Sequence, residues 1–237
     1  MNKTSAKKNK VRNRKIAIFS SAVFILILLI AFVIIPNAKT KRALSEAGKD
    51  TIEPASIGET VYFGIYDGEA IAWQVLDIKG EKVLLITKDC VDEKPYNDFH
   101  VDITWEDCTL RKWLNEDFID SFSEAQQANI ELTNVENTDN PVYGTDGGND
   151  TIDKVFLLSI DEVTDYFPDK KSRIARYDNN TAWWWLRTPG VDNNIGYYTA
   201  VVYSNGDIID TGYYIDRPSR IGVRPALWLN MQEDVDD

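Results

Sequence analysis

The chain has 237 residues, of which 43% are hydrophobic and 11% aromatic, and it carries 38 acidic against 26 basic side chains. This content of large apolar side chains excludes intrinsic disorder as the overall state, because it supplies ample surface to bury. Two cysteines and one histidine exclude a disulfide-framed miniprotein, a four-cysteine zinc site and any multi-histidine metal centre, and they remove most hydrolytic triads.

Charge is divided unequally along the chain. Residues 1–42 contain ten Lys and Arg and no acid, so all 38 acids lie in residues 43–237 together with the remaining 16 bases. Such an asymmetry indicates two different environments. The acidic part repels polyanions, so no nucleic-acid partner is expected.

Residues 16–35 form a run of twenty residues without a charge. A helix of that length spans about 30 Å, the thickness of a hydrocarbon core. A cleaved signal peptide and a buried soluble helix are the alternatives. A signal peptide has a shorter apolar stretch, and residues 36–38, Pro-Asn-Ala, are a poor cleavage site. We therefore expect an uncleaved signal-anchor, a transmembrane helix over residues 16–36.

The bases that flank this apolar run predict its orientation. Seven precede it and three follow it, which favours a cytoplasmic N-terminus in a single-pass protein of the cell membrane. We expect a basic cytoplasmic tail over residues 1–15 and a stalk or linker over 37–58. An extracytoplasmic domain is expected over 59–230 and an acidic tail over 231–237.

The beginning of the outer domain has the pattern of strands. Residues 60–66, 70–78 and 82–88 are short runs rich in Val, Ile, Tyr and Trp, and turn residues separate them. This arrangement predicts a β-meander.

The middle of the chain has the pattern of helices. Three helix starts have the spacing of a capping box, at Thr104, Ser123 and Ser159. A strand over 154–159 leads into the third. The first helix presents one apolar stripe, formed by Leu110, Trp113, Leu114 and Phe118.

Strand patterns return over residues 183–187, 197–203, 207–215 and 223–229. Asn205-Gly206 predicts a two-residue hairpin turn between the second and third of these, since both residues tolerate positive φ. The fold class expected is α+β, a mixed and mainly antiparallel twisted sheet with helices in the middle of the chain, in which the first and last strands pair.

Four blocks occur in one order, over residues 104–115, 144–159, 184–190 (Trp-Trp-Leu-Arg-Thr-Pro-Gly) and 223–226 (Val-Arg-Pro-Ala). Together they resemble an uncharacterised family of bacterial domains, mainly Gram-positive, described as a domain of unknown function. The resemblance covers residues 59–230, with Thr188 where the family is expected to have Ser, and it implies no activity. More distantly, residues 185–189 and 222–225 resemble the C-type-lectin-like fold of the formylglycine-generating enzymes.

Aromatic side chains of the last strands are candidates for a ligand-binding surface. Strand alternation sends Trp184 to the face opposite its two Trp neighbours, and Tyr197, Tyr198 and Tyr213 could add rings nearby. Flat aromatic faces stack on sugars or peptides. The alternative is that these rings pack in the core, where Trp is most often found.

The polar loop over residues 134–153 gathers carboxylates and amides of the kind that Ca²⁺ prefers, without EF-hand spacing. Asx turns that cap the loop's own amides are the alternative, and no other cofactor is indicated. The candidate metal ligands are Asp139, Asn140, Asp146, Asn149 and Asp150.

Cys90 and Cys108 could form a disulfide, or they could be two buried free thiols. A catalytic thiol would need His100, the only histidine, as its partner. The formylglycine-generating enzymes carry their catalytic cysteines in the C-terminal half, and no cysteine follows Cys108, so that activity is argued against.

Three arginines lie inside apolar blocks, at Arg111, Arg187 and Arg224. We expect them to form structural pairs with carboxylates such as Glu106 or Asp153.

The sequence thus predicts a membrane-anchored domain that binds a glycan, a peptide or an envelope protein without catalysis. The alternatives are an envelope enzyme with a site near His100 and Cys108, and a structural subunit of an envelope complex.

Overall fold

The computed structural model describes residues 37–192, 197–216 and 221–231. The chain divides into a unit of residues 1–42 and a unit of residues 43–237. The expected cytoplasmic tail, the expected transmembrane helix and residues 232–237 of the expected acidic tail lie outside the described residues. Among the described residues, no helix has the length and apolar character needed to cross a bilayer.

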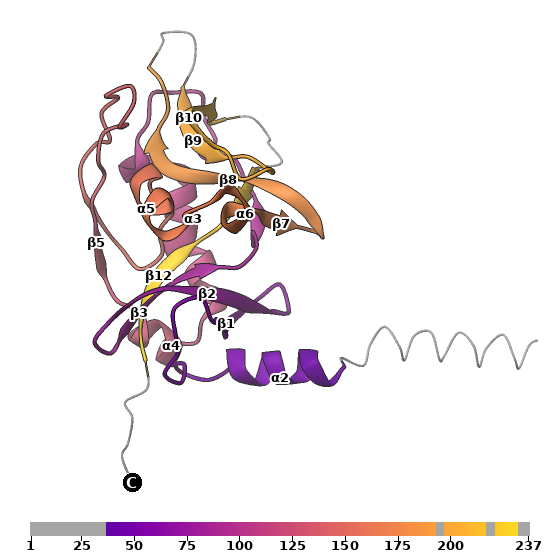
Figure 1. Ribbon diagram of the computed structural model, residues 1–237. Coiled ribbons are helices and arrows are strands. Elements are labelled where there is room, and N and C mark those ends of the chain that lie inside the picture. The colour runs from indigo at the N-terminus through magenta and orange to yellow at the C-terminus, as the bar shows by residue number, and fades with distance from the viewer. Residues whose placement is uncertain (1–36, 193–196, 217–220, 232–237) are drawn as a thin grey trace, which may run out of the picture. The chain divides into compact units, whose positions relative to one another are not determined.

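The domain is mixed α and β and mainly antiparallel, as expected (Figure 1). Its first sheet contains the predicted meander, which is formed by β1 (Thr60–Tyr66), β2 (Glu69–Lys79) and β3 (Lys82–Thr87). The fourth strand is β12 (Ala226–Asn230), and the order is β1-β2-β3-β12. The expectation that the first and last strands pair was therefore wrong. The chain returns to the free side of β3, which leaves β1 at the edge.

The second sheet has the order β10-β9-β8-β11-β4. These strands are β10 (Ile208–Tyr214), β9 (Tyr198–Val202), β8 (Asn180–Pro189), β11 (Ile221–Val223) and β4 (Asp92–Glu93), and β7 (Ala175–Tyr177) also pairs with β8. The register shifts once between β8 and β9 and once between β9 and β10. Such bulges bend strands, and this sheet curls strongly in Figure 1.

The chain crosses between the two sheets twice, and the two crossings lie side by side. Residues 88–91 connect β3 to β4, and residues 224–225 connect β11 to β12. The backbone N–H of Val91 donates to the carbonyl of Val223, and that of Thr87 donates to the carbonyl of Pro225, each at 2.9 Å. We call this region, residues 87–91 and 223–225, the seam.

Short helices follow one another in the middle of the chain, and α3 and α5 lie near the middle of the domain in Figure 1. They are η1 (Trp105–Asp107), α3 (Thr109–Glu116), η2 (Phe118–Ser121), α4 (Glu124–Asn129), α5 (Ile160–Tyr166) and α6 (Lys170–Arg173). The predicted apolar stripe is confirmed at Leu110, Leu114 and Phe118, which are buried, whereas Trp113 is half-buried. A small sheet of β5 (Thr133–Val135) and β6 (Thr151–Asp153) precedes α5.

Two of the three predicted capping boxes are confirmed. Ser123 and Ser159 each accept a hydrogen bond from the third residue of the helix, and that residue's side chain bonds back to the cap. The prediction at Thr104 was wrong, because its side chain makes no capping bond and only one 3₁₀ turn follows it. Cys108 takes that role instead, and its Sγ accepts from the N–H of Arg111 at the start of α3.

The predicted hairpin between β9 and β10 is present with a longer loop than expected. Gly206 donates to the carbonyl of Tyr203, and Tyr203 donates to the carbonyl of Asp207. Gly206 has a φ of 83°, but Asn205 does not have positive φ. Five residues, 203–207, therefore connect the strands, with the glycine alone in the left-handed region.

Two further segments differ from the sequence-based expectation. Residues 154–159 form no strand, since Lys154 and Val155 lie in a bend and Phe156 makes a single bridge to Ala226. The segment expected to be a stalk contains α2 (Ala38–Ala47). Its end is attached to the domain, because Gln126 Nε2 donates to the carbonyls of Ala47 and Lys49, both at 2.7 Å.

Candidate functional site

The structure places Trp184 in the core, so the expected role in ligand binding does not fit it. Its side chain is 0% exposed, and its Nε1 donates to the carbonyl of Arg173 in α6. Trp185 on the opposite face is also buried, with Nε1 donating to the carbonyl of Lys94. Alternation sends the two rings to opposite faces as expected, but both faces of β8 are covered here. Whether a tryptophan of β8 is buried therefore depends on which segments pack on its side of the sheet.

Half-buried aromatic side chains form a continuous row across β8, β9 and β10. The ring centroids of Trp183 and Tyr203 are 3.9 Å apart and stacked, and those of Trp183 and Tyr213 are 5.4 Å apart, edge to face. Tyr213 contacts Tyr214 at 6.0 Å, and Tyr214 contacts Tyr198 at 4.6 Å. We call these five residues the aromatic row.

The register of the strands explains the row. Trp184 pairs with Val202, so one step further along this antiparallel register brings Trp183 opposite Tyr203. Tyr214 pairs directly with Tyr198. Tyr198 and Tyr213, which the sequence offered as candidates, both lie in the row and are linked through Tyr214. Trp183 and Tyr203 were not among the candidates, because their contact depends on the register between two strands.

Tyr197 does not belong to the aromatic row. It is 37% exposed, and its ring meets the imidazole of His100 at 5.1 Å between centroids. The ring of Tyr197 therefore packs on His100 at the surface.

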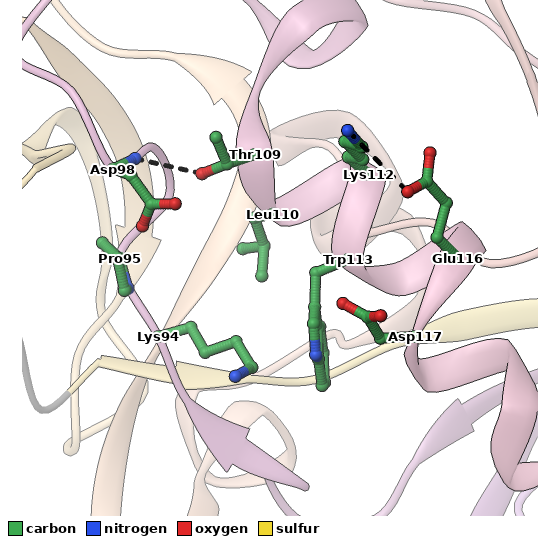
Figure 2. A pocket seen from close by; sticks show the side chains of 9 residues that line it. All are labelled: Lys94, Pro95, Asp98, Thr109, Leu110, Lys112, Trp113, Glu116 and Asp117. Atoms are coloured by element: carbon green, nitrogen blue, oxygen red, sulfur yellow. Dashed lines mark hydrogen bonds and ion pairs between the residues drawn. The ribbon is translucent and has the colours of Figure 1, made fainter.

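A cleft of about 350 Å³ opens between residues 94–98 and α3. Figure 2 shows Trp113 projecting from α3 across this opening, with Lys94 reaching toward it from the adjoining strand segment. The Nζ atom of Lys94 lies 4.5 Å from the centroid of the Trp113 ring. We call this hollow the Trp113 cleft. The sequence alone does not reveal this cleft. Trp113 fits the apolar stripe of α3, and no local pattern indicates that Lys94 lies beside it.

Comparison with known proteins decides the family. A protein-family model described as "Domain of unknown function (DUF6273)" matches residues 80–231, which is more than half of the chain. The chain belongs to this family. The match supports the resemblance to an uncharacterised domain family, and it begins just after β2. No curated protein and no solved structure matches the chain.

In this DUF6273 domain the loop proposed to bind Ca²⁺ uses its oxygens to hold itself together. Asp139 accepts from the N–H of Gly147, Asp146 from Gly148, Asp150 from Asn137, and Asn140 from Val142 and Tyr143. Asn149 donates to Glu106. The bonds of Asp146 and Asn140 to the second residue after them are Asx turns, as in the alternative reading, and the other bonds join more distant residues. Within the described ranges, no group of three or more His, Cys, Asp or Glu is placed to hold a metal.

The two cysteines are separate, buried and free, so the disulfide that the sequence allowed is not formed. Cys90 lies in the seam so close to Gly222 that a Cβ there would be 2.3 Å from its Sγ, whereas Cys108 caps α3. Burial raises the pKa of each thiol to about 12. Both are therefore protonated and weakly nucleophilic at neutral pH.

His100 is not assembled with a cysteine. Its Nδ1 lies 3.1 Å from a carboxylate oxygen of Asp216 at the surface. Cys108 is 1% exposed and lies in the core. No contact joins the two in the part of the chain that the structure describes, so the geometry does not support the alternative of a catalytic Cys-His pair.

Two of the three arginines form the structural pairs that the sequence predicted. Arg111 Nε lies 2.7 Å from Asp153 Oδ1, and Arg187 pairs with Glu162. Arg224, in the seam, has no carboxylate partner among the described residues. It lies between the rings of Phe167 and Trp184, and burial lowers its pKa to about 10.

Proposed function

We propose that this DUF6273 chain is a membrane-anchored, extracytoplasmic binding module that holds a glycan on the aromatic row and catalyses no reaction. The observation that carries the proposal is the continuity of the five rings across three adjacent strands. The packing of one strand into the core does not require half-buried rings to continue across three strands.

A glycan suits the row because sugar rings present flat apolar C–H faces flanked by hydroxyl groups. Aromatic rings bury such faces at a low cost in side-chain entropy. Four of the five rings are tyrosines, whose hydroxyl groups can both donate and accept hydrogen bonds. A surface with these two properties favours a polyhydroxylated ligand over a purely apolar one.

The chemistry of the remaining candidates favours binding without catalysis. The two thiols have a raised pKa because they are buried. His100 is engaged with Asp216 and Tyr197 at the surface. A nucleophile with an adjacent base is the usual requirement for covalent catalysis, and these groups do not supply one.

The proposed location rests on the sequence. The uncharged run over residues 16–35 and the bases before it are the features of an anchor with a cytoplasmic N-terminus. The acidic remainder of the chain would then face the outside, where glycans of the envelope are accessible.

The test is binding of the full-length protein, purified in detergent micelles, to a panel of bacterial envelope glycans. Tyr203→Ala and Tyr213→Ala should each weaken binding roughly threefold to tenfold, which is the loss expected for one stacking ring. Tyr143→Ala is the matched control, because Tyr143 is 44% exposed and lies outside the row. Equal binding by all three variants, with their folding intact, would show that the row is not the glycan site.

A further inference from the structure

We propose that the Trp113 cleft binds an alkylammonium group, and that the side chain of Lys94 occupies the position of this group when no ligand is present. The proposal does not depend on glycan binding, because the cleft and the aromatic row share no residue.

The position of Lys94 shows that the cleft accommodates a cation. Its Nζ atom lies 4.5 Å from the centroid of Trp113 and 3.3 Å from Asp92 Oδ2. An ammonium group is attracted both to the face of an indole and to a carboxylate. A ligand ammonium in this position would make the same two contacts.

Trp113 is held in place by neighbours other than Lys94. Tyr66 meets its ring edge to face at 6.2 Å between centroids, and Phe118 contacts it at 5.5 Å. The hydroxyl of Tyr66 also donates to Asp92 Oδ2 at 2.9 Å. The Trp113 ring and the Asp92 carboxylate therefore keep their positions when Lys94 moves away.

The charges around the cleft favour a cation over an anion. Asp98, Glu116 and Asp117 line it, against Lys94 and Lys112, and Lys112 lies 3.8 Å from Glu116. Figure 2 shows Asp117 beside the Trp113 ring, on the other side from Lys94. The carboxylates of Asp98 and Asp117 form no ion pair with any residue that the structure describes. An anionic ligand would meet this excess of negative charge.

The phenol of Tyr66, whose ring contacts Trp113, responds to the carboxylate of Asp92. Burial and then the neighbouring Asp92 raise the pKa of Tyr66. A site in which negative charge disfavours phenolate formation also favours a bound cation.

Displacing Lys94 should be easy. Its side chain is 30% exposed and that of its partner Asp92 is 23% exposed, so solvent reaches the ion pair and screens it in part. A flexible lysine side chain can then extend into solvent, while its backbone carbonyl keeps the hydrogen bond from Trp185.

The test uses the full-length protein in micelles and follows the indole N–H resonances by NMR during titration with two probes. Choline carries a trimethylammonium group, and Nα-acetyl-lysine N-methylamide carries a primary ammonium, as in a peptide. Binding of either one supports the proposal, and the tighter of the two indicates the source of the natural ligand. Absence of binding by both, up to millimolar concentration, would refute it.

Three variants sharpen the result. Lys94→Gln removes the internal competitor and should tighten binding about twofold to fivefold, because the binding-competent state becomes fully populated. Asp92→Asn removes the carboxylate partner and should weaken binding. Lys49→Gln is the matched control, and it should change little because Lys49 pairs with Glu53 outside the cleft. Weaker ammonium binding by Lys94→Gln would overturn the proposal, since Lys94 would then be part of the recognition surface.

Discussion

The guanidinium carbon of Arg224 lies 4.9 Å from the centroid of the Trp184 ring, in the seam where the chain crosses between the two sheets. Phe167 contacts the guanidinium at 5.1 Å, and Arg224 Nε donates to the carbonyl of Thr87 at 2.8 Å. One Nη atom has no hydrogen-bond partner in the described part of the chain. A buried cation is thus held by two rings and one carbonyl.

This arrangement predicts that Arg224→Lys is more destabilising than Arg224→Met. Lysine keeps the charge but cannot stack its ammonium as a flat group between two rings, and a poorly solvated charge is costly. Methionine removes the charge and fills the slot. We expect Arg224→Lys to cost about 2–4 kcal/mol in the free energy of unfolding at pH 7. Urea denaturation measures both variants, and a smaller loss for lysine than for methionine would contradict this account.

The buried thiols predict a loss of stability at alkaline pH. Burial raises the pKa of Cys90 and Cys108 to about 12, so in the folded state both stay protonated while in the unfolded chain they ionise near pH 9. The unfolded state then binds fewer protons, and stability falls as pH rises above 9. Each thiol should account for about 1 kcal/mol between pH 9 and pH 10.

Cys108→Ala should remove the contribution of Cys108 to this slope, about 1 kcal/mol between pH 9 and pH 10, whatever its effect at pH 7, and denaturation at several pH values measures it. A thiol reagent provides the control: two thiols should react after unfolding without reductant, and few or none before it. Absence of reactive thiols in the unfolded chain would show a disulfide and contradict the structure.

The environment of Gly206 predicts that adding a single methyl group there lowers the stability of the protein strongly. Its φ is 83°, and a Cβ there would lie 1.8 Å from the carbonyl oxygen of Lys170. Gly206→Ala should cost about 2–4 kcal/mol, the sum of a left-handed conformation and a clash with backbone. Gly80→Ala is the matched control, with φ of 61° and no atom within 4 Å, and it should cost about 1 kcal/mol. Similar thermal unfolding temperatures for the two would disprove the clash.

The helix caps give a paired prediction. Ser159 accepts from the N–H of Glu162, so Ser159→Ala should destabilise the protein by about 1 kcal/mol. Thr104 makes no capping bond, so Thr104→Ala should cost less than half as much. Chemical denaturation of both variants checks the order, and the reverse order would mean that the cap at Ser159 contributes little.

The candidate sites were only partly predictable from the sequence. Tyr198 and Tyr213 were identified, because tyrosines on strands near a hairpin signal have a good chance of sharing a surface. Trp184 was wrongly placed there, since strand alternation says which side a ring points to and not whether that side is covered. Trp113 was seen only as part of an apolar stripe, because its partner Lys94 comes from another segment.

The sequence by itself determined the elements that depend on neighbours along the chain. The meander, the caps at Ser123 and Ser159, the stripe of α3 and the mixed α+β class all follow from local periodicity and hydrogen bonding. Only the tertiary structure decided which strand β12 joins, which tryptophans are buried, and that Lys94 meets Trp113. These relationships depend on strand register and on contacts between distant segments, and no local pattern of side chains encodes them.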